Sequence, residues 1–140
     1  MIQRLQSLWL LIASALAFAT LKISFFSGNI LVENVKQFQR FTAMTNMFLM
    51  ILTVVVGIGA LVALFLYKDR KLQIKITAAV LILSVLNLIL YYLQTNNFIP
   101  TDWAFDLTAI AALTIPFFLI MAIRGISKDE KTIRSLDRLR

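Results

Sequence analysis

Residues 41–67 read FTAMTNMFLMILTVVVGIGALVALFLY, a run of 27 positions without a charged side chain. A helix needs roughly 20 apolar residues to cross the hydrocarbon core of a bilayer, so this run can cross it with some tilt. Three further uncharged runs follow the same rule, with 17 residues at 5–21, 18 at 76–93 and 17 at 107–123. The sequence therefore predicts an all-α, four-helix transmembrane bundle.

The expected spans are about 5–26, 41–67, 76–93 and 105–123, with a tail at 124–140, all in one integral membrane domain of residues 1–140. The first span reaches Phe26 only if Lys22 extends its amine outward to the headgroups. The composition agrees with lipid as the solvent, because 60% of the residues are hydrophobic and 15% are charged. Soluble domains have about 45–50% apolar and about 25% charged residues.

The chain contains no cysteine and no histidine. Their absence excludes disulfides, thiol redox chemistry and thiolate metal sites, and it removes the most common general base. We expect no catalytic residue, no metal and no cofactor, and we predict that the protein is not an enzyme.

Lysine and arginine mark the two sides of the membrane. Arg4, four basic residues in 68–75 and six in the tail lie on one side, eleven in all, whereas the other side has Lys22, Lys36 and Arg40. Because cytoplasmic loops carry the excess of basic residues, both termini and the 68–75 loop are predicted to be cytoplasmic. The net charge of +7 is thus assigned to membrane orientation, and no nucleic-acid partner is expected.

The candidate polar residues inside the spans are Asn46, Ser84 and Asn87. An amide in a span needs a partner, and we expect Asn87 to bond to Ser84, Thr77 or Thr114 as structural glue. The alternative is a small oligomeric transporter or channel with a polar site near Asn87 and Pro116, where the proline removes a backbone donor.

Small residues at four-residue spacing, such as Gly59 and Ala63, predict close packing between helices.

Asp102 and Asp106 would share a face if the fourth helix began early. Two carboxylates at the outer surface offer a second alternative, a membrane enzyme acting on lipid, although solvated acids at a helix start are the ordinary interpretation.

The tail is the most distinctive segment. Ser127 to Glu130 matches a capping box, which predicts that a short amphipathic helix begins there. Its basic residues could contact anionic lipid headgroups or a partner protein in the membrane or cytoplasm. The candidate contact residues are Arg124, Lys128, Lys131, Arg134, Arg138 and Arg140.

Both ends of the chain resemble a known family. The start, MIQRLQS at 1–7, and the end, KDEK at 128–131 followed by RS at 134–135 and DRLR at 137–140, resemble the domain-of-unknown-function family 4293. The length and the four-span layout are similar as well. The resemblance implies a multi-pass protein of a bacterial inner membrane and transfers no catalytic residue. We expect a structural or accessory membrane component of unknown oligomeric state, acting through its basic tail.

Overall fold

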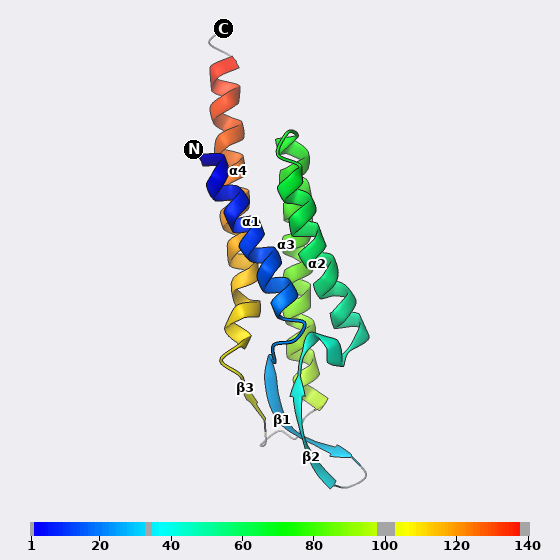
Figure 1. Ribbon diagram of the computed structural model, residues 1–140. Coiled ribbons are helices and arrows are strands. Elements are labelled where there is room, and N and C mark those ends of the chain that lie inside the picture. Colours follow the sequence, from blue (N-terminus) through cyan, green and yellow to red (C-terminus); the bar gives the residue numbers. More distant parts are fainter. Residues whose placement is uncertain (1, 33–34, 98–102, 138–140) are drawn as a thin grey trace.

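The computed structural model describes residues 2–32, 35–97 and 103–137. Within them, four helices pack side by side, and each makes its main contacts with two neighbours in the order α1, α2, α3, α4 and back to α1 (Figure 1). Their bounds are Ile2–Ala19 for α1, Met47–Phe65 for α2, Arg70–Leu93 for α3 and Ala109–Asp137 for α4. The predicted all-α class is confirmed, with a small sheet added at one end of the bundle.

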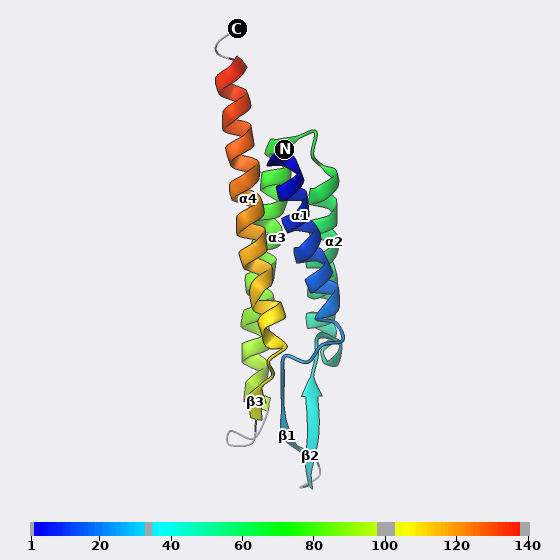
Figure 2. The same cartoon turned by 60° about the vertical axis from the view of Figure 1, so that its left-hand side comes forward.

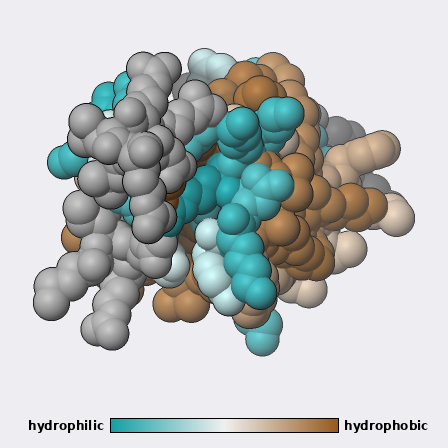
Figure 3. Space-filling view, turned by 90° about the horizontal axis from the view of Figure 1, so that it is seen from above, coloured by the Kyte–Doolittle hydropathy of each residue, from teal (hydrophilic) through white to brown (hydrophobic). Residues whose placement is uncertain are grey.

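Three of the helices, α2, α3 and α4, are long and apolar enough to cross a membrane, and α1 offers a shorter apolar stretch, Leu5–Ala19. Their outward faces carry large apolar side chains, such as Phe48, Ile82 and Phe117. Seen from the end where α4 emerges, hydrophilic residues gather at that end and hydrophobic residues form the flank (Figure 3). Lipid is the solvent that such a surface requires, so the chain is a membrane protein.

Helix α1 is shorter than the predicted span of 5–26, because it ends at Ala19. Turns follow it, in which the Thr20 hydroxyl donates to the Ala17 carbonyl at 2.7 Å and the Lys22 amide to the Ala19 carbonyl at 3.1 Å. Phe26 then begins a strand and is fully buried. Residues 20–26 therefore leave the helix to fill a second core.

A three-stranded antiparallel sheet forms that end of the molecule, in the order β2, β1, β3. The strands are β1 (Phe26–Val32), β2 (Val35–Phe41) and β3 (Trp103–Phe105), with short 3-10 helices at Ala43–Thr45 (η1) and Gln94–Asn97 (η2). We call this the sheet end, and the opposite end, with the α2–α3 turn and the C-terminal part of α4, the tail end (Figures 1 and 2).

The buried side chains form two clusters. One fills the centre of the bundle around Leu10, Val56 and Leu119. The other is aromatic and lies at the sheet end, where the ring of Phe25 stacks on Tyr91 at 4.6 Å and Phe26 stacks on Phe41 at 4.7 Å between centroids. The first stack joins the start of the sheet to Tyr91 on α3, and the second joins β1 to β2.

Two helix starts differ from the prediction because of capping. Asn46 caps α2, so the predicted start at residue 41 moves to Met47 while Phe41 belongs to β2. Asp69 caps α3 by accepting from the Leu72 amide at 3.1 Å, so α3 begins at Arg70 instead of residue 76. Side-chain oxygens at these positions satisfy amides that a helix start leaves unpaired.

Candidate interaction surface

The C-terminal part of α4 extends past the ends of the other helices. The helix runs without a break from Ala109 through Pro116 to Asp137. The prediction of a separate helix starting at a capping box is therefore wrong, since Ser127 lies inside a helix whose preceding residues are already helical. Both views show the last turns of α4 standing beyond the N-terminal end of α1 and the α2–α3 turn (Figures 1 and 2).

The lower part of this segment is held against α1. The Gln6 side-chain amide donates to a carboxylate oxygen of Asp129 at 2.6 Å, and both side chains are buried. Gly125 makes the approach possible, because a Cβ there would lie 2.7 Å from Cγ of Gln6. Ile126 is fully buried beside them. Up to Asp129, α4 packs against α1; Glu130 and Ile133 still lie beside the α2–α3 turn, and the last turns of the helix project beyond them.

Four of the six predicted contact residues lie on the described part of α4. Arg124, Lys128 and Lys131 are exposed. The backbone of Arg134 continues the helix, whereas Arg138 and Arg140 lie outside the described residues.

The structure brings the α2–α3 turn close to the tail. A groove of about 650 Å³ is lined from the turn by 67–71 and from α4 by Glu130 and Ile133. Lys68, Lys71 and Lys75 are exposed at the same end. The two segments therefore lie close together, and the groove between them combines the basic residues Lys68, Arg70 and Lys71 with the acidic residues Asp69 and Glu130.

The three predicted intramembrane polar residues do not form one site. Asn46 caps α2, where its side-chain oxygen accepts from the Phe48 amide at 2.9 Å. The Ser84 hydroxyl donates to the Leu81 carbonyl of its own helix at 2.8 Å. Asn87 donates to the Thr53 hydroxyl on α2 at 2.9 Å, so its partner is a residue that the sequence did not single out.

Asn87 and Ser84 both border a small cavity in the bundle, which Thr20, Thr53 and Tyr91 line as well. The cavity measures about 10 Å³, close to the minimum volume for one water molecule. Pro116 does not line it. Within the described residues this cavity is a small enclosed space, and the Asn87–Thr53 bond joins α2 to α3 instead of the predicted contact with Ser84, Thr77 or Thr114.

The predicted carboxylate pair is not formed on a helix. Helix α4 begins at Ala109, after Asp106, and Asp102 lies outside the described residues. Asp106 instead accepts a hydrogen bond from the Ser27 hydroxyl at 2.8 Å, and its backbone amide donates to the Phe25 carbonyl at 3.1 Å. It also lines an apolar pocket of about 480 Å³ between α3 and α4.

Sequence reasoning missed two buried amide contacts. Gln6 was left in the first span without a role, and Gln73, whose side chain donates to the Ala63 carbonyl at 2.9 Å, lay in the expected loop. A glutamine at the end of an apolar run needs a partner. The sequence indicates that Gln6 needs a hydrogen-bond partner, but it does not indicate which one, because Gln6 and Asp129 are 123 positions apart.

The match with a known family covers almost the whole chain. Residues 2–139 match the family described as a domain of unknown function (DUF4293). None of the curated proteins and none of the solved structures matches the chain. With so complete a match, the chain belongs to the domain-of-unknown-function family 4293.

Proposed function

We propose that the protein is a non-enzymatic accessory component of a bacterial cytoplasmic membrane, which docks an acidic cytoplasmic protein on the projecting end of α4. In this proposal the N-terminus, the α2–α3 turn and the tail are cytoplasmic. The observation that carries it is the unbroken helix from Ala109 to Asp137.

Helix length supports a protein partner over lipid for the far end of the tail. At 1.5 Å per residue, α4 is roughly 43 Å long, against a hydrocarbon core of about 30 Å. An amphipathic helix that binds a membrane surface lies in the plane of that surface. The tail continues a membrane helix and so leaves that plane.

Basic residues at different distances from the bundle along α4 then have different partners. Arg124 and Lys128, with the α2–α3 turn, lie nearest the bundle and suit anionic headgroups, since such contacts fade within a Debye length of about 8–10 Å. Arg134, Arg138 and Arg140 come later in the chain and suit an acidic protein surface.

Affinity purification in mild detergent, after cross-linking in cells through a photoreactive residue at Ser135, tests this function. Substituting Arg134, Arg138 and Arg140 with Gln should remove the cross-linked partner. The matched control replaces Lys68, Lys71 and Lys75 with Gln, which removes the same charge from the same end and should leave the partner bound. Recovery of the protein alone in every case, or loss of the partner in the control only, contradicts the proposal.

A further inference from the structure

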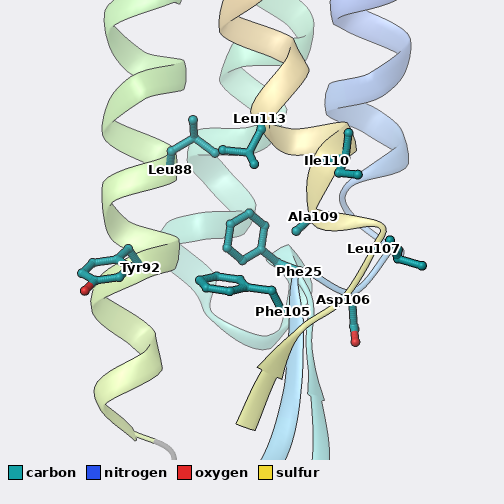
Figure 4. Close-up of a pocket in the computed structure, with 9 residues that line it drawn as sticks. All are labelled: Phe25, Leu88, Tyr92, Phe105, Asp106, Leu107, Ala109, Ile110 and Leu113. Atoms are coloured by element: carbon teal, nitrogen blue, oxygen red, sulfur yellow. The ribbon is translucent and has the colours of Figure 1, made fainter.

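The pocket at the sheet end lies on the opposite end of the bundle from the basic tail. It measures about 480 Å³, within the range of roughly 300–1,000 Å³ that small-molecule sites occupy. Figure 4 shows it between α3, which supplies Leu88 and Tyr92, and the start of α4, which supplies Ile110 and Leu113. It opens between two helices that are long and apolar enough to cross a membrane.

The pocket is preformed by rigid rings. The Phe25 ring lies between the two helices, stacked on Tyr91 at 4.6 Å and edge-on to Phe105 at 5.8 Å between centroids. Ala109, on the first turn of α4, has too small a side chain to close the gap. Phe25 is thus a buried wall of the pocket, whereas Tyr92 and Ile110 are exposed at its rim.

Polarity changes along the pocket. Leu88 and Leu113 line the part nearer the bundle centre, whereas the Asp106 carboxylate points toward the sheet and away from the helices (Figure 4). Among the described residues that line the pocket, Asp106 is the charged one, and one of its carboxylate oxygens accepts a hydrogen bond from the Ser27 hydroxyl. An apolar slot with a single acid at its outer end matches a molecule that has a hydrocarbon chain and a cationic group.

We propose that this pocket binds a membrane phospholipid with an amine headgroup, its acyl chain beside Leu88 and Leu113 and its ammonium at Asp106. Lipid chains are as apolar as leucine, so burying one from the bilayer gives no hydrophobic gain. Selection among lipids must therefore come from the headgroup. A carboxylate attracts an ammonium and repels the net negative charge of phosphatidylglycerol, which has no amine.

Native mass spectrometry of the full-length protein, released from nanodiscs of equimolar phosphatidylethanolamine and phosphatidylglycerol, tests the site. We expect retained phosphatidylethanolamine to exceed phosphatidylglycerol several-fold. Asp106→Asn keeps the shape and the Ser27 contact and should bring the ratio close to one. Ile110→Trp should fill the pocket and abolish retention of both lipids, whereas Ile120→Trp, a lipid-facing residue outside the pocket on the same helix, should change neither.

Three results overturn the proposal. Equal retention of the two lipids by the unchanged protein would show that the pocket does not select between them. An unchanged ratio of phosphatidylethanolamine to phosphatidylglycerol in Asp106→Asn would show that Asp106 does not cause the selection. A doubled protein mass that is lost only in Ile110→Trp identifies a second copy of the chain as the occupant. If Ile110→Trp does not fold, as judged by circular dichroism, Asp106→Asn still decides between the outcomes.

Discussion

Gly59 on α2 lies against Val80 on α3. It is the tightest of the glycine contacts that the structure describes. A Cβ at this position would lie 2.5 Å from a methyl carbon of Val80, which is shorter than real carbon contacts allow. Lipid offers no hydrophobic force between helices, so van der Waals contact at small residues carries the association. The small-residue spacing of Gly59 and Ala63 indicated such packing, and the structure supplies the partner.

Gly59→Ala should lower the free energy of unfolding by about 1–3 kcal/mol, the usual cost of overpacking. Val80→Ala in the same chain should recover part of that loss, because it removes the methyl group that the new Cβ meets. Unfolding in a detergent titration, followed by circular dichroism, measures both. An equal loss in the single and double variants would show that the two residues do not meet.

The Gln6–Asp129 hydrogen bond fastens the base of the tail. Gln6→Leu should destabilise the protein by about 1–3 kcal/mol, because it leaves a buried carboxylate without its donor. Changing both residues to Leu should be nearly neutral, since no polar group is then left unpaired. Thermal unfolding of the three proteins checks this, and an unfavourable double variant would contradict it.

At the scale of single elements, the stretch from Ser127 to Glu130 in α4 can be a capping box or part of a continuous helix, and a substitution distinguishes the two. If Ser127 capped a new helix, Ser127→Ala would cost about 1 kcal/mol of helix stability. Inside a continuous helix, the same change should be neutral or favourable by about 0.5 kcal/mol, because Ala is the better helix former. We expect the second result in amide hydrogen exchange of residues 128–137. Faster amide exchange of residues 128–137 in Ser127→Ala would instead support the interpretation that Ser127 caps a separate helix.

The helical elements could be predicted from uncharged runs, but their ends could not. Phe25 and Phe26 read as part of an apolar span, and only the aromatic partners Phe41 and Tyr91, far along the chain, draw them into the sheet-end core. The pairing of β1 with β3 joins residue 26 to residue 105, and no local pattern encodes it. Tertiary contacts of this kind override local preference.

The role of the candidate surface stays a prediction, because the structure shows only that its two segments lie close together. The basic tail and the α2–α3 turn were assigned to one face by counting charges, and the structure places 67–71 beside Glu130 and Ile133. The continuity of α4 was missed because Ser127 and Glu130 fit a capping box equally well inside a helix. The apolar pocket was missed as well, since it depends on Phe25 entering between two helices that follow it in the chain.

The whole molecule has two cores, and they should respond separately to mutation. Phe26→Ala removes a fully buried ring that stacks on Phe41 at 4.7 Å. Such truncations cost about 3–5 kcal/mol. We expect protease cleavage in the β1–β2 hairpin to accelerate while the helix content by circular dichroism stays unchanged. Cooperative loss of the helices in this variant would show that the two clusters are one folding unit.

Orientation can be measured cleanly because the chain contains no cysteine. Gln37→Cys on β2 and Ser135→Cys on α4 are both at exposed positions. In intact bacterial cells stripped of their outer membrane, an impermeant maleimide should label residue 37 but not residue 135, and both should react after the membrane is opened. The reverse pattern would contradict the proposed cytoplasmic tail.

The unbroken α4 also has a mechanical consequence. It is one rod that starts beside the sheet-end pocket and finishes in the projecting tail. Pro116 deprives that rod of one backbone hydrogen bond near its start, where bending costs least. About 30 Å of helix follows Pro116, so a change in tilt of about 10° there would swing the far end by about 5 Å. A bend at Pro116 would therefore change the position of the projecting tail relative to the sheet-end pocket.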